Sequence, residues 1–149
     1  MVRNLTALQP WGLTVLRAAL GIVFLAHGSQ KLFTYGIDGV TAGMASVGIP
    51  FPAVSAVLVT GVEFLGGLAL LLGLFTRAAA IPLAITMLVA TLQVHAKGGF
   101  FLPNGYEFTL TLLAASIALA LTGPGALALD NRIFRERTAG NPKQVAAAA

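Results

Sequence analysis

Long apolar stretches constrain the fold of this chain more than any other feature of its sequence. Four of them, over residues 11–32, 52–74, 77–96 and 106–121, are separated by shorter polar or glycine-rich segments. A helix rises about 1.5 Å per residue, so roughly 20 apolar residues are needed to cross about 30 Å of hydrocarbon. Only 9% of the residues are charged, compared with roughly 25% in ordinary soluble domains. The sequence therefore predicts an all-α, integral membrane four-helix bundle that forms one domain over residues 1–130.

The segment between the first two spans is too polar and too rich in glycine to cross a bilayer. Asp38 is of the residue type that caps helix N-termini, and Gly48, with two prolines close behind it, favours a helix end. We therefore expect a short interfacial helix over residues 40–47. Thr76 is expected to cap the third span, and Pro82 is expected to bend it.

Positive charge is distributed unevenly between the two sides of the predicted bundle. One side carries only Lys31 and Lys97. Because cytoplasmic loops are enriched in Lys and Arg, the richer side, with both termini, is predicted to be cytoplasmic in a bacterial-type inner membrane.

Residues 131–149 are expected to form a basic, partly disordered tail. The first span is expected to be a retained anchor rather than a cleaved signal peptide, because no small-x-small cleavage site follows it. The predicted cytoplasmic side of the bundle, which is the side richer in Lys and Arg, contains Arg3, Arg77, Arg132, Arg135, Arg137 and Lys143.

Several classes of site are excluded by composition and motif. The chain has no cysteine, which removes disulfides, thiol redox couples, iron–sulfur ligation and cysteine-based zinc sites. A redox role must therefore depend on a bound organic cofactor or another subunit. The net charge of +4 is not gathered into a basic patch with interleaved aromatic residues, so no nucleic acid partner is expected. The stretch GVEFLGGLALLLG over residues 61–73 departs from the G-x-G-x-x-G pattern and lies inside a span, so no nucleotide motif is present.

Two charged residues, Arg17 and Glu63, lie deep inside predicted spans. Glu63 stands about eleven residues, or roughly 16 Å, from each end of its span, too far for a carboxylate to reach the surface. An unpaired charge at that depth costs at least about 2.5–3.5 kcal/mol, so we expect Arg17 to pair with Glu63. Such a pair either only fixes the register of two helices or serves as a charge relay or ligand anchor. A stripe of cations and small residues that points into the bundle is formed by Arg17, Gly21, Phe24, Gly28 and Lys31.

Four other ionisable residues are expected near the outer face: His27, Lys31, His95 and Glu107. They can converge as the catalytic groups of an outward-facing pocket. Two histidines and a glutamate also suit zinc or iron, but they come from three helices without a local H-x-x-x-H or E-x-x-H motif, so no metal site is predicted. Glu107 can instead complete a capping box that begins at Asn104, and a single histidine at a membrane interface is more often a surface residue.

Aromatic residues near the same face would provide apolar walls for a flat ring. A quinone fits such a pocket, because its carbonyl oxygens could accept hydrogen bonds from His27 or Lys31 while Glu107 or His95 exchanges protons. The alternative is that these aromatic residues form an interfacial belt. The candidate cofactor-binding residues are Arg17, Glu63, Phe24, Phe101 and Tyr106.

Four motifs together resemble the DoxX family of small four-helix membrane proteins. They are R-x-x-L-G-x-x-F-x-x-H-G-x-x-K-L from residue 17, EFLGGLALLLGLFTR from residue 63, HAKGGFF from residue 95 and NGYEF from residue 104. The resemblance implies an oxidoreductase or a subunit of one, and relatives are linked to quinone-coupled thiosulfate oxidation, to resistance against quinones and catechols, and to oxidative stress. It also implies as family motif positions Arg17, His27, Lys31, Glu63, Arg77, His95 and Glu107.

Three functions are consistent with these features. The leading hypothesis is a component of a quinone-linked membrane oxidoreductase system that works with a soluble or membrane redox partner. The second is a non-catalytic scaffold that anchors a soluble enzyme through the basic segment NRIFRER after Asp130. The third is a small transporter that uses an Arg17–Glu63 pair at the midplane. Small residues such as Ala69 and Gly73 permit a homodimer as readily as internal packing.

Overall fold

A computed structural model describes residues 6–133, and every regular element in that range is helical. Three continuous helical stretches, Gln9–Ser46, Pro52–Leu72 and Thr76–Gly98, are long and apolar enough to cross a membrane, and Glu107–Thr122 is a shorter apolar helix. The expected all-α membrane bundle is therefore confirmed. The elements in chain order are α2 (Gln9–Ser29), η1 (Gln30–Tyr35), α3 (Gly36–Ser46), α4 (Pro52–Leu72), α5 (Thr76–Val89), η2 (Ala90–His95), η3 (Ala96–Gly98) and α6 (Glu107–Thr122).

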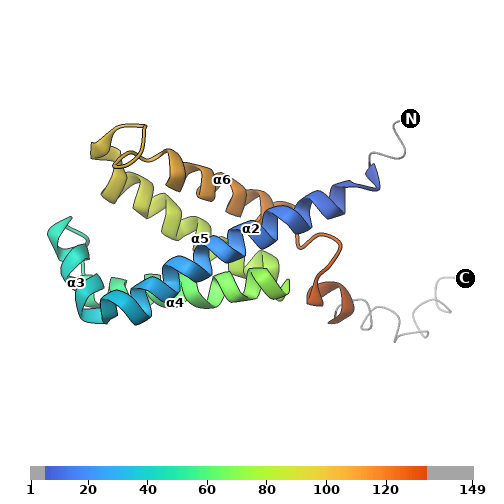
Figure 1. The fold of residues 1–149 in the computed structure, drawn as a ribbon, viewed down its shortest axis with the longest axis horizontal. Coiled ribbons are helices and arrows are strands. Elements are labelled where there is room, and N and C mark those ends of the chain that lie inside the picture. Colours follow the sequence, from blue (N-terminus) through green and yellow to red (C-terminus); the bar gives the residue numbers. More distant parts are fainter. Residues whose placement is uncertain (1–5, 134–149) are drawn as a thin grey trace, which may run out of the picture.

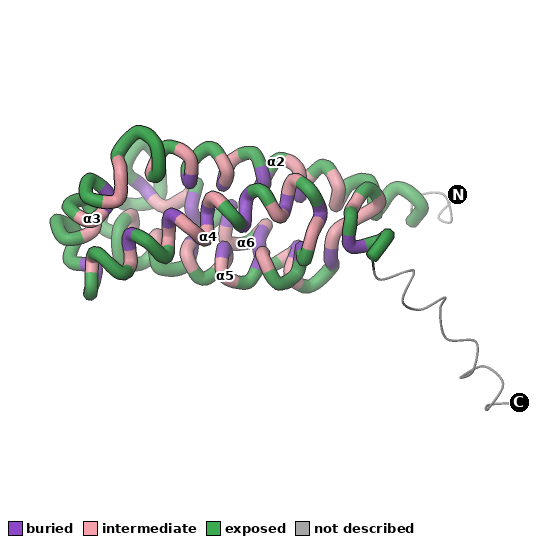
Figure 2. Tube along the Cα trace, turned by 90° about the horizontal axis from the view of Figure 1, so that it is seen from below, coloured by how far each residue is buried: buried purple, intermediate pink, exposed green. Residues whose placement is uncertain are grey.

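The helices are arranged as two antiparallel pairs. α2 packs mainly against α4, and α5 packs mainly against α6 (Figure 1). The pairs share a core of large apolar side chains that includes Phe24 of α2, Leu70 of α4, Leu83 of α5 and Leu119 of α6. Buried residues therefore follow the inward stripe of each helix, while the outward stripes are exposed (Figure 2). The first and last described residues lie at the same end of the bundle.

Glycines set the spacing and the register of α2 against α4. A Cβ atom on Gly28 would lie only 2.4 Å from the backbone nitrogen of Phe64, and one on Gly67 would lie 2.4 Å from that of Leu25. Real Cβ atoms do not approach so closely, so the two backbones are in direct contact at these points. Gly21 makes a third contact of this kind with Leu71. The small-residue stripe predicted on the first span faces α4.

The helix between the first two spans begins earlier than predicted. α3 starts at Gly36, directly after η1, so Asp38 lies in its first turn and the prediction that Asp38 is the N-cap is wrong. The chain changes direction at Gly36, whose φ of +67° is accessible mainly to glycine. The expected end at Gly48 is confirmed by its φ of +79°. α3 then packs against α4 through the buried side chain of Val40.

The segment after α6 closes the end of the bundle at which the first and last described residues lie. The Asp130 carboxylate accepts hydrogen bonds from the backbone N–H groups of Phe75, at 2.6 Å, and Thr76, at 2.9 Å. These are unsatisfied donors at the start of α5, so Asp130 caps that helix from 55 residues away. The prediction that Thr76 caps the third span is wrong, because its hydroxyl is buried and has no hydrogen-bond partner. Most of the predicted tail, from residue 134 onward, lies outside the described residues.

Candidate functional site

A buried ion pair joins the C-terminal part of α2–η1 to α4. Lys31 Nζ lies 2.5 Å from Glu63 Oε2, with 22% of the lysine side chain and 5% of the glutamate side chain exposed. Glu63 is eleven residues into α4, so it lies roughly 16 Å from the start of that helix, at hydrocarbon depth. The deep carboxylate therefore does have a cationic partner, but the partner is Lys31.

The prediction that Arg17 pairs with Glu63 is wrong. Arg17 Nε donates to the Pro124 carbonyl oxygen at 2.9 Å, Nη1 donates to the Leu71 carbonyl oxygen at 3.0 Å and to that of Leu70, and Nη2 donates to the carbonyl oxygen of Leu127. The guanidinium thus satisfies the last carbonyl groups of α4 and ties residues 124–127 to them. The structure therefore does not contain the Arg17–Glu63 pair on which the transporter hypothesis depends.

The register of α2 on α4 explains why Glu63 pairs with Lys31 and not with Arg17. Gly28 packs against the backbone of Glu63 and Phe64, which brings Lys31, one turn further along, to the Glu63 carboxylate. Arg17 lies eleven residues before Gly28, or roughly 16 Å away along the axis, and so meets the C-terminal end of α4. The predicted pair assumed that the middles of the first two spans face each other, and the glycine contacts place the helices in a different register.

α2 and α5 each continue at their C-terminal ends into a π-helical turn. Lys31 lies in η1, Gln30–Tyr35, and His95 is the last residue of η2, Ala90–His95. π-helical turns are rare and often occur at functional sites. Two of the ionisable residues predicted for the outer face therefore lie in backbone segments of this uncommon type.

Thr60 lies next to Glu63 on α4, although it is not among the residues predicted for the site. It lies on α4 one turn before Glu63, its residue is 2% exposed, and its hydroxyl has no hydrogen-bond partner. Residues three apart share one face of a helix, so the Thr60 and Glu63 side chains are neighbours. A polar residue at this spacing from a charged one, inside an apolar span, was the signal available in the sequence.

Among the described residues, the other predicted catalytic residues are not bonded to the ion pair. His27 is exposed, and its ring centroid is 6.1 Å from that of Phe108 on α6. Glu107 Oε1 accepts a hydrogen bond from the Leu102 backbone N–H at 2.8 Å. The alternative of a capping box from Asn104 is wrong, because the residue before α6 is Tyr106 and the carboxylate binds Leu102. Within residues 6–133, no hydrogen bond or ion pair links His27, His95 or Glu107 to Lys31.

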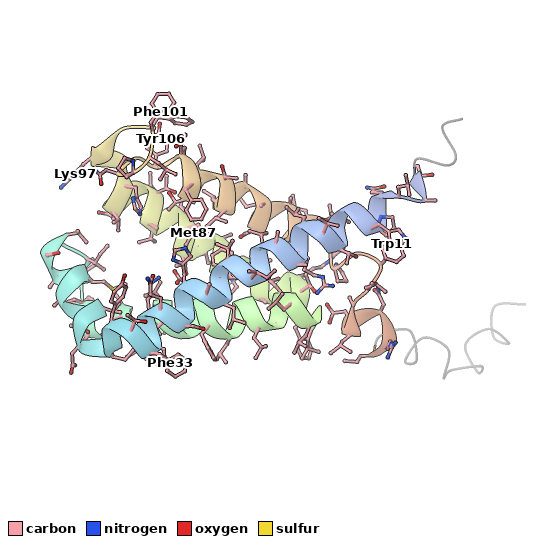
Figure 3. All side chains as sticks on the ribbon, in the orientation of Figure 1. Trp11, Phe33, Met87, Lys97, Phe101 and Tyr106 are labelled. Atoms are coloured by element: carbon pink, nitrogen blue, oxygen red, sulfur yellow. The ribbon has the colours of Figure 1, made fainter. Side chains whose placement is uncertain are left out.

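The aromatic residues predicted to line the pocket lie in two different environments, the hydrophobic core and the loop before α6. Phe24 is 1% exposed and belongs to the hydrophobic core. Phe101 packs edge-on against Phe100, which packs edge-on against Tyr106, and all three belong to the loop before α6. Figure 3 shows Phe101 and Tyr106 at the end of the bundle opposite Trp11, with Phe33 on the far side from Phe101. Exposed aromatic residues at both ends of the helices are typical of the two membrane interfaces.

The comparisons with known proteins agree with this architecture. The model of the DoxX family matches residues 12–96, more than half of the chain. The chain belongs to the DoxX family. An uncharacterized protein of Haemophilus influenzae is 35% identical over 139 residues, which cover 91% of this chain and 100% of that protein. The Bacillus subtilis protein named "Putative oxidoreductase CatD" is 35% identical over 130 residues, 87% of this chain and 92% of that protein. The Escherichia coli protein named "Inner membrane protein YphA" is 32% identical over 136 residues, 85% of this chain and 93% of that protein. No solved structure shows a significant match.

The region that matches the DoxX model contains both ends of the ion pair. Lys31, Glu63, Thr60 and Arg17 all lie within residues 12–96, whereas Glu107 and α6 lie beyond it. In this DoxX-family membrane protein, the Lys31–Glu63 pair, Thr60 and Arg17 therefore belong to the matched part of the chain, and Glu107 does not.

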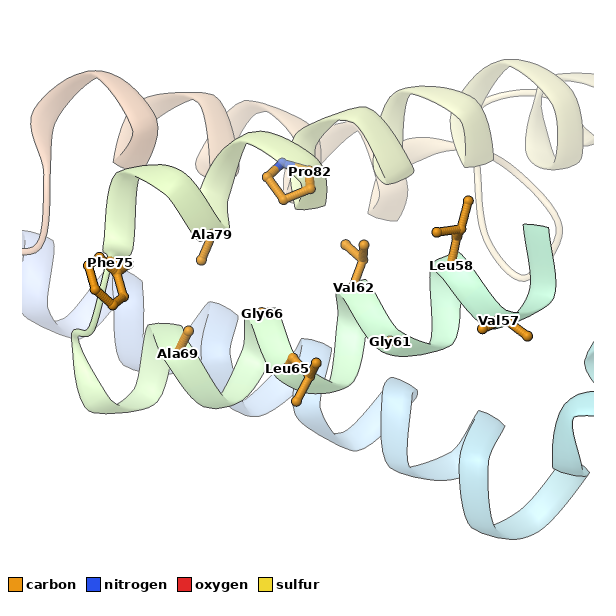
Figure 4. Close-up of a pocket in the computed structure, with 10 residues that line it drawn as sticks. All are labelled: Val57, Leu58, Gly61, Val62, Leu65, Gly66, Ala69, Phe75, Ala79 and Pro82. Carbon is orange, nitrogen blue, oxygen red and sulfur yellow. The ribbon is translucent and has the colours of Figure 1, made fainter. Parts of the chain in front are cut away.

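A groove on the outside of the DoxX bundle provides a contrast with this polar region. It has a volume of about 490 Å³ and lies between α4 and α5 (Figure 4). All of its lining residues are apolar, so it offers hydrogen bonds to no ligand through its side chains. Across residues 6–133, no group of three or more His, Cys, Asp or Glu side chains is placed to hold a metal ion. The groove is lined by Val57, Leu58, Gly61, Val62, Leu65, Gly66, Ala69, Phe75, Ala79 and Pro82.

Proposed function

We propose that this DoxX protein is a component of a quinone-linked oxidoreductase system in a bacterial-type cytoplasmic membrane, with both termini in the cytoplasm. The observation that carries the proposal is the Lys31–Glu63 ion pair inside the bundle. Charged side chains at hydrocarbon depth are rare, and they mark proton and ligand sites more often than they mark structural contacts.

The pair is not needed to set the helix register. The backbone contacts of Gly21, Gly28 and Gly67 already fix how α2 lies on α4. Burying two charges costs several kcal/mol per ion before their attraction is counted, and apolar residues often replace such pairs without loss of stability. A structural role alone therefore gives little reason to place a lysine and a glutamate here, which favours a role in binding or proton exchange.

The side chains present suit a quinone headgroup. A quinone accepts two electrons and two protons when it is reduced to a quinol. The Lys31 ammonium has three N–H donors and gives one to Glu63, so it can also donate to a carbonyl oxygen. Glu63 uses only Oε2 in the pair, which leaves Oε1 to accept a proton or a hydroxyl hydrogen bond. In this proposal the electrons come from a partner protein of the same system.

The relatives support the broad class. The Bacillus subtilis relative has oxidoreductase in its name, and the Escherichia coli relative is named an inner membrane protein. The uneven distribution of Lys and Arg supports the orientation.

The test is native purification in mild detergent, followed by solvent extraction and mass spectrometry of the extract. The expected result is a bound quinone in the wild-type protein and its loss in the double variant Lys31→Met, Glu63→Gln, which removes both charges and so leaves neither one buried alone. Lys97→Met is the matched control, because Lys97 is exposed in η3. Wild-type protein that contains no quinone and binds none on titration would contradict the proposal. Proteins that copurify with the wild type would identify the electron donor.

A further inference from the structure

The Thr60 hydroxyl lacks the hydrogen bond that five other threonines in the helices make. It shares this property with Thr76 and Ser116 among the described residues, but of these three it is Thr60 that lies one helical turn from the Lys31–Glu63 pair. Thr14, Thr86, Thr91, Thr111 and Thr122 each donate to the carbonyl oxygen four residues earlier. This is the usual way for a helical threonine to satisfy its hydroxyl in an apolar medium. Thr60 has the same option at Ala56, yet its hydroxyl is buried and bonded to nothing.

Two oxygen atoms without a hydrogen-bond partner therefore lie one helical turn apart on the same face of α4. Thr60 Oγ1 has no partner, and Glu63 Oε1 has none within the described residues. Lys31 has N–H groups left over after its bond to Glu63, and its side chain is the one of the three that is partly exposed. Leaving such groups unpaired inside a membrane costs free energy, so their combination indicates that something polar binds between them.

We propose that Thr60, Glu63 and Lys31 form a recess that binds an oxygen atom of a small molecule, the ring carbonyl of a quinone or the hydroxyl of a quinol. This inference rests on the proposed function and adds a specific residue to it. Thr60 donates to the carbonyl oxygen from α4, and Lys31 donates to it from η1. Glu63 accepts from the hydroxyl of the reduced form. A water molecule offers the same chemistry and is the other source of such an oxygen.

The test uses Thr60→Val, which replaces the hydroxyl with a methyl group of similar size. Thr86→Val is the matched control, because the Thr86 hydroxyl is satisfied by Pro82 within its own helix. Binding of a short-tailed benzoquinone is measured by equilibrium dialysis in detergent, and the thermal unfolding midpoint is measured without quinone. Loss of one hydrogen bond is expected to weaken quinone binding by about three- to tenfold in Thr60→Val and to leave it unchanged in Thr86→Val.

The unfolding midpoint distinguishes the two sources of the oxygen. If the recess lacks a partner until quinone binds, Thr60→Val removes an unpaired buried hydroxyl, and its midpoint without quinone equals or exceeds that of the wild type. A lower midpoint in Thr60→Val, with quinone affinity unchanged, would assign the recess to a bound water and overturn the assignment to quinone.

The remaining outcomes separate this inference from the proposed function. Equal quinone affinity and equal midpoints in Thr60→Val and the wild type would overturn the recess while the protein still binds quinone elsewhere. Wild-type protein that binds no quinone would overturn the proposed function and, with it, the assignment to quinone. In that case a lower midpoint of Thr60→Val would still report a polar recess that holds water.

Discussion

Replacing Gly28 with alanine tests the claim that glycine contacts set the position of the ion pair. The new Cβ atom would lie 2.4 Å from Phe64 N, 2.6 Å from Phe64 Cα and 2.9 Å from Glu63 C. All three are backbone atoms, so no side-chain rotation can relieve the contact. Ordinary van der Waals contact begins at 3.4 Å, and 3.4 minus 2.4 leaves a shortfall of 1.0 Å that α2 and α4 must make up by moving apart.

This movement would reach the Lys31–Glu63 contact, which lies one helical turn from Gly28. A displacement of that size would lengthen the 2.5 Å contact to about 3.5 Å, beyond the length of a good hydrogen bond. Overpacking of this kind destabilises proteins by about 1–3 kcal/mol. We therefore expect Gly28→Ala to lower the free energy of unfolding and to weaken the quinone binding that is proposed above.

The control is Gly61→Ala on α4. A Cβ atom on Gly61 meets nothing within 4 Å, and the substitution improves helix propensity by about 0.5–1 kcal/mol. Both variants are unfolded thermally in the same detergent and lipid mixture. The two substitutions are chemically identical, so their difference reports the packing against Phe64. If Gly28→Ala were as stable as Gly61→Ala, α2 and α4 would not be in backbone contact there, and the account of the register would be refuted.

Two further predictions concern the end of the bundle where α4 ends and α5 begins. Asp130→Ala removes the cap of α5 and should destabilise the protein by about 0.5–2 kcal/mol in the same thermal assay, whereas Asp38→Ala, at an exposed position, should have little effect. Arg17→Met removes the guanidinium hydrogen bonds to carbonyl groups at the end of α4 and in residues 124–127 and should cost about 3 kcal/mol or more, whereas Arg77→Met loses one long bond of 3.4 Å to Thr122 and should cost far less.

For both predictions, equal stability of the variant and its control would contradict the expected result. Equal stability of Asp130→Ala and Asp38→Ala would mean that the start of α5 is satisfied without the carboxylate. An Arg17→Met protein as stable as Arg77→Met would mean that the guanidinium does not hold residues 124–127 against α4.

The spans and their inward faces could be predicted because they depend on local properties of the chain. Apolar stretches long enough to cross a bilayer specify helices at residues 52–72 and 107–122 with little regard to their neighbours. The stripe of Gly21, Phe24 and Gly28 also follows from the helical repeat, and all three residues are buried. Each of these features requires only the period of one helix.

The pairing of charges could not be predicted in the same way. The depths of Arg17 and Glu63 were each inferred from the ends of their own spans. Which residues face each other depends on the register of the two helices, and because the predicted register was wrong, Arg17 was predicted as the partner of Glu63 in place of Lys31. The cap of α5 was missed for a similar reason, since Asp130 follows it by more than 50 residues. Glu107 was placed correctly at the start of its helix, but the loop that it binds depends on how residues 98–106 fold back.

The order of residues along the chain is enough to specify a helical membrane protein, the faces of its helices that turn inward, and the presence of ionisable groups inside it. The partners of those groups depend on how the helices pack: Lys31 pairs with Glu63, Arg17 with backbone carbonyls, and Asp130 with the start of α5. The physical reason is that hydrophobicity acts residue by residue along one helix, whereas register is fixed by a few close backbone contacts between two. Gly28 against Phe64 and Gly67 against Leu25 are those contacts here.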